Sequence, residues 1–367
     1  MKTLTIKASS PYPIYIGQQL LMQPLLADTI KALHKRVVLI TDSNVATLLA
    51  SSYQAYFNTH GIHTEHLTFP AGENHKTRET KALLEDALLA KSYGRDTCLI
   101  ALGGGVTTDL VGFIAATYMR GVPVIDIPTT LLAMVDASIG GKTGVNTPFG
   151  KNLIGSFNQP HAVFIDTDTL ASLSKREYIN GLAEVIKHAI IADAKQVALL
   201  ETKHEAILAR DPKTLAELIL ENCQVKQHIV EQDEHEHGIR QHLNYGHTIA
   251  HAIELIEQYQ IGHGEAVAIG MLVEAYIAVR LGILAETELS RLQKLMSLYA
   301  LPLSTKAFTD KSAFIAALTL DKKSKAKTPR FVLLKKLGQV YQPGEEYTVA
   351  VAEDILQDAL DWAASHT

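Results

Sequence analysis

The sequence predicts an α/β protein whose N-terminal half is a parallel sheet covered by helices and whose C-terminal half is mostly α-helical. In the first half, short apolar runs alternate with helical patterns, and after about residue 172 helical patterns dominate. Such alternation is typical of sheets that bind ligands at the carboxyl ends of their strands. A length of 367 residues also favours two domains. We place them at 1–171 and 172–367, with the active site in the cleft between them.

Composition narrows the class of protein. The chain is 47% hydrophobic and 20% charged, as expected of a soluble globular protein. A net charge of −5 argues against nucleic acid as a partner. The two cysteines, Cys98 and Cys223, suit a reducing compartment without disulfides. Neither a signal peptide nor an apolar run of about eighteen residues is found, so we expect a cytoplasmic protein without a membrane span.

The first half should form an open sheet. Its first seven residues alternate as an edge strand does. We expect buried strands at 37–42, 66–70, 97–102, 124–127 and 163–166, and helices at 44–56, at 76–91 and from the glycines at 103–105 to 119.

A triple glycine, Gly103, Gly104 and Gly105, separates a buried strand from a helix. Glycines at this place let the backbone approach a phosphate, which helix N-terminal amides can hold. The G-x-G-x-x-G fingerprint is absent, because Val106 and Thr107 follow. A tight strand-to-helix turn would use the same glycines, so both interpretations stay open.

Polar residues follow the other strands. Asp42 ends one strand and suits either a ribose hydroxyl or the cap of the next helix. Glu73 and Lys76 lie in a loop after another strand, and Asp109 lies one turn into the glycine helix. Together they favour a bound dinucleotide.

A glycine-rich passage from 128 to 146 has few charges. Asp136 and Lys142 stand near its middle, and Lys151 follows in a second glycine loop. Lysines on glycine loops are suited to holding an anion, although solvated loop lysines would look the same.

Helices should dominate the second half. We expect them at 177–192, 212–231, 286–300 and 311–319 and at the end of the chain near 362, with late strands at 331–334 and 347–351. Asp211 should cap the helix that Pro212 opens. On the first helix, Glu184 and Lys187 share one face. A carboxylate in an apolar segment needs an ion partner, so Glu184 is a candidate metal ligand.

The histidine-rich segment is the centre of the expected site. Asn244 should cap a helix from 245 on which His247 and His251 are one turn apart. His263 follows between two glycines, at the start of an apolar helix expected over 265–281. With Arg240 just upstream, this arrangement suggests a metal site beside an anion site. Spacing alone favours both His247 and His251 as ligands, whereas surface or core histidines are the plainer alternative.

Several motifs occur in one order along nearly the whole chain. They are Pro70-Ala-Gly-Glu73-x-x-Lys76, Gly-Gly-Gly-Val-x-x-Asp109, Arg120-Gly, Pro-Thr-Thr-Leu-Leu-Ala-Met-Val-Asp136, Gly-Gly-Lys142, Gly-Lys151-Asn152, Ala-Glu184-Val-Ile-Lys187, Arg240-x-x-Leu-Asn244-x-Gly-His247, His251 and His263-Gly-Glu. This set resembles the 3-dehydroquinate synthase family, enzymes of the shikimate pathway that produces aromatic amino acids. The family's fold implies a Rossmann-like nucleotide-binding domain followed by the helical domain.

The resemblance also implies cofactors and their ligands. It assigns a divalent ion, zinc or cobalt, to Glu184, His247 and His263, and turns His251 to the substrate. The implied NAD contacts are Asp42, Glu73, Lys76, Gly103, Gly104, Gly105, Val106, Asp109, Thr129, Thr130, Lys142 and Lys151.

The implied substrate is the keto-acid phosphate 3-deoxy-D-arabino-heptulosonate 7-phosphate (DAHP). Its implied contacts are Arg120, Asp136, Lys142, Lys151, Asn152, Lys187, Lys226, Arg240, Asn244, His251 and Lys322, among which the catalytic residues are Lys142, Lys187, Arg240, Asn244 and His251. The implied reaction is a transient oxidation by NAD, phosphate elimination, re-reduction and aldol closure to 3-dehydroquinate, and a homodimer is the family expectation.

Other functions remain as alternatives. A related cyclase would act on sedoheptulose 7-phosphate or glucose 6-phosphate, but Arg240, Asn244 and His251 favour a substrate with a carboxylate. A metal-dependent polyol dehydrogenase would need fewer lysines and would accumulate NADH. A non-enzymatic metal- or nucleotide-binding protein would release no phosphate.

Overall fold

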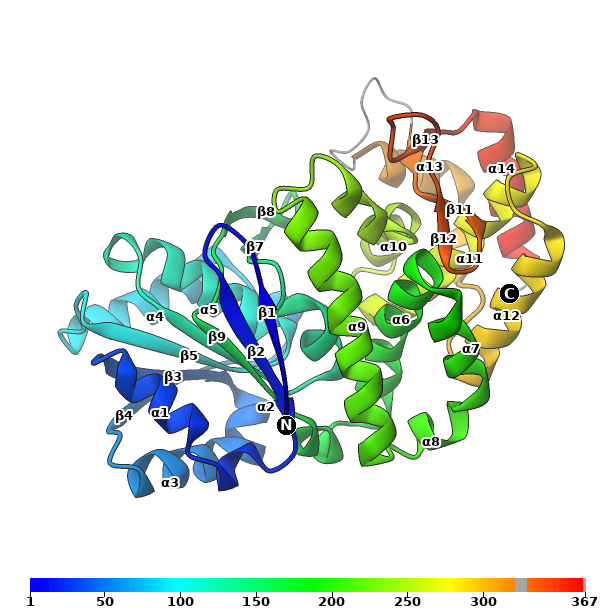
Figure 1. The fold of residues 1–367 in the computed structure, drawn as a ribbon. Coiled ribbons are helices and arrows are strands. Elements are labelled where there is room, and N and C mark those ends of the chain that lie inside the picture. The colour runs from blue at the N-terminus through cyan, green and yellow to red at the C-terminus, as the bar shows by residue number, and fades with distance from the viewer. Residues whose placement is uncertain (321–328, 366–367) are drawn as a thin grey trace. The chain divides into compact units, whose positions relative to one another are not determined.

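A computed structural model describes residues 1–320 and 329–365 of the chain (Figure 1). The chain packs into two compact units. Unit 1 consists of Met1–Ser174 and Leu215–Glu234, and unit 2 of Lys175–Thr214 and the residues from His235 on. The predicted domain limits, 1–171 and 172–367, stay a prediction, and the packing adds that the segment from Leu215 belongs with the N-terminal residues.

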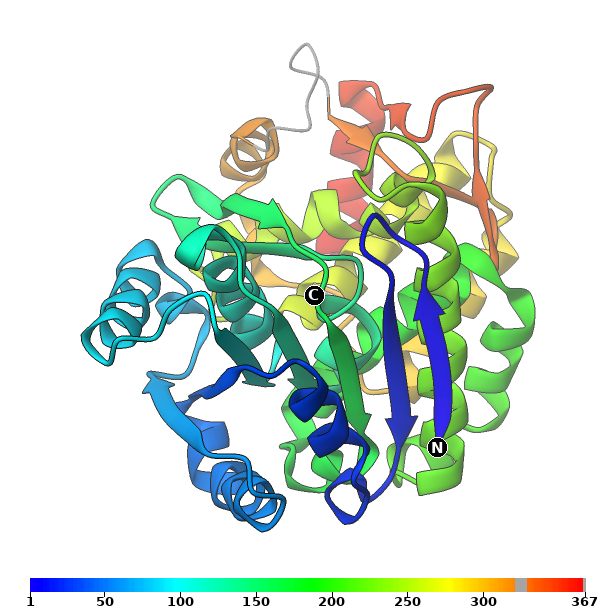
Figure 2. The same cartoon turned by 60° about the vertical axis from the view of Figure 1, so that its left-hand side comes forward.

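Unit 1 is built around a seven-stranded sheet with the order β1-β2-β9-β6-β5-β3-β4. Its strands are β1 (Lys2–Ile6), β2 (Tyr12–Gly17), β3 (Arg36–Asp42), β4 (Thr64–Phe69), β5 (Thr97–Gly103), β6 (Val124–Pro128) and β9 (Ala162–Asp166). From β2 to β4 all neighbours are parallel, and β1 runs antiparallel to β2 at the edge. Figure 2 shows the dark-blue β1 and β2 beside the green β9. The predicted parallel sheet and its edge strand are confirmed.

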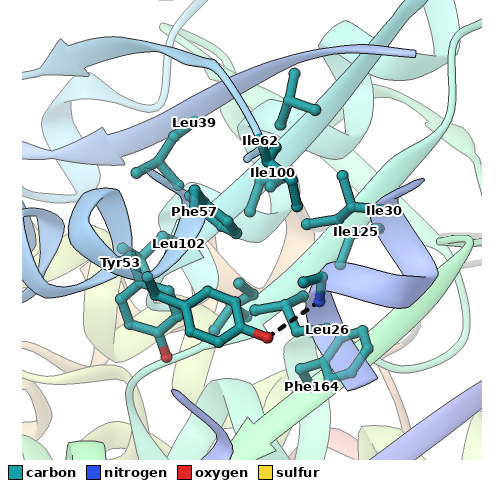
Figure 3. Packing of buried hydrophobic residues seen from close by; sticks show 14 of the residues in the cluster. Leu26, Ile30, Leu39, Tyr53, Phe57, Ile62, Ile100, Leu102, Ile125 and Phe164 are labelled. Atoms are coloured by element: carbon teal, nitrogen blue, oxygen red, sulfur yellow. Dashed lines mark hydrogen bonds between the residues drawn. The ribbon is translucent and has the colours of Figure 1, made fainter. Parts of the chain in front are cut away.

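Helices cover both faces of this sheet. They are α1 (Leu25–Ala32), α2 (Ser43–Val45) continuing through a π-helical turn into α3 (Ser51–Thr59), α4 (Arg78–Ala90) and α5 (Gly105–Thr117). Alternate residues of β5 point to opposite faces: Ile100 packs with α1 and α3, and Leu99 with α4 and α5. Figure 3 shows the first of these clusters, in which Leu26 of α1 and Phe57 of α3 meet the strands. Burial on both faces explains the continuous apolar strand sequences.

Unit 2 is mostly helical. Its helices are α6 (Lys175–Ala192), α7 (Ala194–Thr202), α8 (His204–Leu208), α10 (His247–Ile256), α11 (His263–Arg280), α12 (Glu286–Leu298), α13 (Lys311–Leu320) and α14 (Glu353–Ala364), and its short strands are β10 (Arg330–Phe331), β11 (Leu333–Lys336), β12 (Gln339–Tyr341) and β13 (Val349–Ala350). The long helix α9 (Pro212–Gln232) begins in unit 2 and belongs to unit 1 from Leu215 on. Asp211 caps it, as predicted, by accepting from Thr214 N–H at 2.9 Å.

Two local predictions were wrong. The lysine-bearing glycine loops are an antiparallel hairpin, β7 (Lys142–Thr147) and β8 (Gly150–Phe157), because alternate residues of this segment face α5, where Val145 is buried. Asn244 does not cap a helix. It ends a 3-10 helix (Ile239–Asn244), and α10 begins only at His247, after Gly246 in the left-handed conformation (φ 81°). Glycine adopts this φ without strain, so the chain turns there and not at Asn244.

None of the helices in the described part of the chain combines the length and hydrophobicity needed to cross a lipid bilayer.

Candidate functional site

The glycine turn lies between β5 and α5. β5 ends at Gly103, and Gly104 is the N-cap of α5 without any side-chain cap. A Cβ atom on Gly104 would lie 3.0 Å from Thr130 Cγ2, and one on Gly105 would lie 3.2 Å from the Ala137 Cβ. The first amides of α5 therefore lack a capping side chain, in a tight place that glycine fits. Such a helix N-terminus fits a phosphate of the expected dinucleotide.

Asp42 ends β3, the neighbour of β5. One carboxylate oxygen, Oδ1, accepts from Asn44 and Val45 N–H at 2.9 and 3.1 Å, so Asp42 caps α2. The other, Oδ2, accepts from the Thr107 hydroxyl at 3.3 Å. Asp42 therefore caps α2 and also bonds to Thr107 in the first turn of α5. Its contact with a ribose stays a prediction.

The loop residues Glu73 and Lys76 contact α5 and β7. Lys76, which is buried, forms an ion pair with Asp109 of α5. Glu73 accepts from the Asn146 side-chain amide at 2.7 Å, and Asn146 N–H donates to Lys76 O at 2.7 Å. Burial raises the pKa of Asp109, although Lys76 opposes this effect. Three of the predicted NAD residues are therefore brought together beside the glycine turn.

Five more predicted residues of unit 1 lie on α9, on the π-helical turn Ala133–Ala137 and on the β7–β8 hairpin. Lys226 of α9 forms an ion pair with Asp136 and also donates to its backbone oxygen at 2.6 Å. Lys142 and Lys151 lie on the strands of the β7–β8 hairpin. Asn152 N–H donates to Asn146 Oδ1 at 3.0 Å, which ties the hairpin to the Glu73 loop.

Three further predicted residues lie on the segments before and after β6. Arg120 ends a short 3-10 helix after α5 and has a positive φ of 67°. Thr129, which is buried, donates its N–H to Gly103 O at 2.9 Å, and Thr130 Oγ1 accepts from Ala133 N–H at 3.2 Å. Thr129 is thus joined to the glycine turn directly.

In unit 2, Glu184 of α6 meets His247 of α10 and His263 of α11. Glu184 is fully buried, and both imidazole Nε2 atoms lie 3.6 Å from its Oε1. One donor atom from each residue lies within 4.8 Å of the other two. Two ligands of a tetrahedral zinc ion, each about 2 Å from the metal, are roughly 3.3 Å apart. The donor set therefore fits a divalent ion such as zinc or cobalt.

Close packing of α10 and α11 places His247. A Cβ atom on Gly270 of α11 would lie 2.0 Å from Gly246 O, so only glycine allows this approach. The buried Glu274 carboxylate accepts from Gly246 N–H at 2.7 Å, and Tyr245 OH donates to Met271 O at 2.7 Å. The residues before His247 are thus fixed on α11.

His263 is held from the other side, by α6. Asn180 Oδ1 accepts from Gly264 N–H at 2.6 Å, and a Cβ atom on Gly264 would lie 1.9 Å from Asn180 O. Glu265 accepts from Gly262 N–H at 2.7 Å. Glycine on each side of His263 therefore lets the first turn of α11 lie directly against the helix that carries Glu184.

Charges around the two histidines differ. Burial, followed by the charge of Lys187, lowers the pKa of His247 well below its ordinary value. Burial also lowers the pKa of His263, but Glu254 and Glu184 outweigh it and raise this pKa to about 10. The negative surroundings that retain a proton on His263 would also attract a metal cation.

Two of the predicted substrate residues of unit 2, Lys187 and His251, adjoin this set. Lys187 is buried and forms an ion pair with Glu184 one turn earlier on α6. His251 lies edge-on to His247, with ring centroids 5.7 Å apart. Arg240 is buried in the 3-10 helix before α10, and the Asn244 amide donates to Glu236 Oε1 at 2.5 Å. Lys322 lies outside the described residues.

Sequence reasoning missed three polar residues at these positions. Asn146 joins the hairpin to the Glu73 loop, Asn180 holds the start of α11, and Glu254 contacts His263. Glu254 carried a usable signal, because it is a carboxylate in the apolar helix of His247, as Glu184 is in α6. The two asparagines carried none, since their partners are distant in sequence.

Comparison with known proteins agrees with this geometry. The family models for the N-terminal and C-terminal parts of 3-dehydroquinate synthase match residues 66–180 and 181–324. The 3-dehydroquinate synthase of Methylococcus capsulatus is 45% identical over 366 residues, covering 98% of this chain and 99% of that protein. That of Nitrosospira multiformis is 43% identical over 346 residues, covering 92% and 94%.

Two similar solved structures of other proteins contain bound ligands. A 2-deoxy-scyllo-inosose synthase complexed with carbaglucose-6-phosphate, NAD⁺ and Co²⁺ is 27% identical with a TM-score of 0.91, covering 99% of this chain and 100% of that one. The 2-epi-5-epi-valiolone synthase of Streptomyces hygroscopicus, with NAD⁺ and Zn²⁺ bound, is 30% identical with a TM-score of 0.89, and both chains are fully covered.

A protein of Sinorhizobium meliloti described as a probable glycerol dehydrogenase shares only the fold, at 16% identity and a TM-score of 0.69 over 96% of each chain. The family models cover more than half of the chain, and the relatives match it almost end to end. This chain belongs to the 3-dehydroquinate synthase family.

Proposed function

We propose that this enzyme converts DAHP to 3-dehydroquinate and phosphate, with NAD and a divalent metal ion as cofactors. The observation that carries the proposal is the buried Glu184 with the two histidine Nε2 atoms at 3.6 Å and Lys187 beside it. Family membership and near-complete coverage by relatives of that name support the reaction. Bound NAD⁺ supplies a reversible hydride acceptor, and the ion a Lewis acid.

The residues of unit 2 would hold and position the reacting carbons. Glu184, His247 and His263 would hold the ion, zinc or cobalt, and leave open positions for substrate oxygens. Arg240, a buried cation, would bind the substrate carboxylate. Lys187 and His251 lie beside the metal set, where they could donate or accept protons at a substrate hydroxyl.

The residues of unit 1 would bind the cofactor and the phosphate. The amides of Gly104 and Gly105 at the start of α5 fit the NAD pyrophosphate, and the carboxylate of Asp42 suits a ribose hydroxyl. Lys142 and Lys151 on the hairpin would hold the departing phosphate as point charges. This local need for cations would account for lysines at these positions in a chain whose net charge is −5.

A single assay tests the reaction. The enzyme is given DAHP and a trace of NAD⁺, and released phosphate is compared with NADH absorbance. We expect many phosphates per NAD and no net NADH, since the hydride returns. Accumulating NADH would favour the polyol dehydrogenase alternative. A protein that only binds metal or nucleotide would release no phosphate at all.

A second candidate is a cyclase that acts on a sugar phosphate without a carboxylate. It is favoured by the likeness to 2-deoxy-scyllo-inosose synthase and 2-epi-5-epi-valiolone synthase. The same assay with glucose 6-phosphate or sedoheptulose 7-phosphate separates the two. We expect phosphate release from DAHP alone, because Arg240 is a buried cation of a kind suited to a substrate carboxylate.

We also propose a cytoplasmic homodimer. The family expectation supports the dimer, and the two free buried cysteines support a reducing compartment. Light scattering on the purified enzyme gives the mass directly, and a monomer mass at working concentration would contradict the dimer.

A further inference from the structure

Glu254 is a buried carboxylate next to the metal set but not one of its predicted ligands. It lies in the last turns of α10 and is 1% exposed. Its Oε1 is 3.1 Å from His263 Nδ1. A carboxylate is rarely buried unless it is paired or hydrogen-bonded. Its position therefore calls for a role in holding this histidine.

The two nitrogens of His263 face different carboxylates. Nε2 lies 3.6 Å from Glu184 Oε1, whereas Nδ1 lies 3.1 Å from Glu254 Oε1. Glu254 is thus on the side of the ring away from the proposed ion. From this side Glu254 is not placed to bind the ion that His263 Nε2 would bind. It can instead accept the proton of His263 Nδ1. That hydrogen bond selects the tautomer whose Nε2 is free to bind a metal.

His247 provides a contrast within the same site. Its Nε2 is also 3.6 Å from Glu184 Oε1, but its Nδ1 lies 3.1 Å from the backbone oxygen of Tyr245. Both rings therefore present Nε2 to Glu184 and have an acceptor at Nδ1. A carboxylate acceptor makes an imidazole more basic than a neutral carbonyl does. His263 should consequently be the stronger metal donor of the two.

The helix geometry makes this contact rigid. Glu254 follows His247 by seven residues, or two helical turns, so both side chains leave the same face of α10. His263 begins α11 after a short turn in which Gln258 and Tyr259 have positive φ values of 49° and 60°. The hydrogen bond between Glu254 and His263 thus joins the two helices across their connecting turn.

We propose that Glu254 is the positioning residue of the metal site: it accepts the Nδ1 proton of His263, directs Nε2 toward Glu184 and so tightens metal binding. This inference rests on the metal set of the proposed function. Outer carboxylates of this kind typically change metal affinity by about 10- to 100-fold.

Three variants of the full chain test the proposal. Glu254→Gln keeps an acceptor oxygen but removes the charge, and Glu254→Leu removes both. Glu257→Gln is the matched control, because Glu257 ends the same helix but bonds the Thr305 hydroxyl and not a histidine. Zinc affinity is measured on metal-free protein by competition with a chromophoric chelator. We expect about 10-fold weaker binding for Glu254→Gln, about 100-fold for Glu254→Leu and no change for Glu257→Gln.

The Co²⁺ absorption spectrum separates positioning from a merely structural role. If Glu254 sets the orientation of His263, the cobalt-bound Glu254→Leu protein has shifted visible bands, because the ligand geometry has changed. A structural role alone would lower the unfolding midpoint but leave the affinity and spectrum of the folded protein as in the wild type. The proposal would be overturned if both Glu254 variants bound zinc as tightly as the wild type and gave the same cobalt spectrum as the wild type.

Failure of the proposed metal set gives a different result: the wild type itself binds no zinc, or Glu184→Gln binds it as tightly as the wild type. Failure of the proposed reaction alone appears in the phosphate-release assay and leaves these zinc affinities unchanged. Should Glu254→Leu fail to fold, Glu254→Gln decides alone, since glutamine has nearly the same shape. Wild-type affinity in the folded Glu254→Gln variant, with an unchanged cobalt spectrum, would then overturn the inference.

Discussion

Each unit of this protein buries at least one lysine–carboxylate pair, and two of these pairs, one from each unit, have different neighbours. In unit 1, Lys76 pairs with Asp109, with side-chain exposures of 5% and 18%. In unit 2, Lys187 pairs with Glu184, at 1% and 0%. Both pairs remove charge from water at a large desolvation cost. The difference lies in the other groups that surround each carboxylate.

Around Glu184 there are two imidazoles whose Nε2 atoms face the same oxygen at 3.6 Å. Around Asp109 the charges of Lys76, Glu73 and Lys226 act on the carboxylate, and burial raises its pKa. The Glu184 cluster therefore has lone pairs to offer a cation, whereas the Asp109 pair joins a loop to a helix. A buried ion pair by itself does not mark a metal site. The added histidines do.

The largest expected effect separates these roles. Glu184→Gln should remove the bound metal and slow turnover by about four orders of magnitude, or about 5 kcal/mol, because the Lewis acid is lost. The Asp109→Asn protein should still bind the metal ion at Glu184, His247 and His263. Phosphate release and metal content after desalting measure both. A Glu184→Gln protein with one zinc and wild-type rate would break the comparison.

The next largest expected effect is a loss of stability, which each lysine variant should show mainly in its own unit. Lys76→Met and Lys187→Met each leave a buried carboxylate without its lysine, which should destabilise the metal-free protein by about 3–5 kcal/mol. The double change Lys76→Met with Asp109→Leu should recover most of the loss, because no buried charge is left. Urea unfolding measures these free energies. A double variant no more stable than Lys76→Met would contradict the argument.

The sequence offers a separate probe for each unit. Its single tryptophan, Trp362, stacks on Tyr276 in unit 2, with ring centroids 4.6 Å apart. Both cysteines are buried in unit 1, and burial raises the pKa of the Cys98 and Cys223 thiols to about 12. Thiol labelling should therefore report the loss in Lys76→Met, and tryptophan fluorescence the loss in Lys187→Met. The reverse assignment would show that the pairs act outside their own units.

A smaller effect compares two glycines inside helices. Gly270→Ala in α11 puts a Cβ 2.0 Å from Gly246 O, a backbone atom, and should cost about 2–3 kcal/mol and weaken zinc binding by His247. Gly112→Ala in α5 meets the Thr143 Cγ2 at 2.5 Å, and alanine regains about 1 kcal/mol of helix propensity. It should therefore cost less. Urea midpoints and zinc affinity measure both, and equal losses would contradict the expectation.

The smallest effect concerns Asp126, a carboxylate of β6 without a lysine partner. In the described chain no hydrogen bond reaches its Oδ1, and burial, then the charge of Asp109, raises its pKa well above the ordinary value. The folded state thus holds a proton that the unfolded chain loses above about pH 4. Stability should fall as pH rises from there until the folded pKa is passed, by roughly 1 kcal/mol per pH unit.

Asp126→Asn does not titrate, so it should flatten this dependence and stabilise the protein at neutral pH. Unfolding curves at several pH values test the difference between the two proteins. A stabilisation that grows toward acid would show that the wild-type carboxyl is ionised when folded.

The residues alone were enough to predict the sheet apart from β2, and to predict part of the metal set. Continuous apolar runs identified β3, β5, β6 and β9, because strands buried on both faces have no polar alternation. Glu184 could be singled out because a charge in an apolar helix needs a partner. Both signals are local, since each depends only on which neighbours in the sequence are apolar.

Other features depended on distant partners. The β7–β8 hairpin looked like two glycine loops, because its strands gain their order from packing on α5. Helix α10 begins at His247 and not directly after Asn244 as predicted, because Gly270 lets Gly246 approach α11. No short-range pattern encodes either contact.

The sequence by itself determined which groups are available: a glycine turn, buried lysines, a carboxylate and three histidines. Only the tertiary structure decided how they combine. His247 and His251 share one helix face, so spacing left both as ligands, and it is the contact of α6 with α10 and α11 that turns His247 and His263 toward Glu184. Helical periodicity fixes which side chains lie on one face, but the rotation of a helix against its neighbours is set by packing.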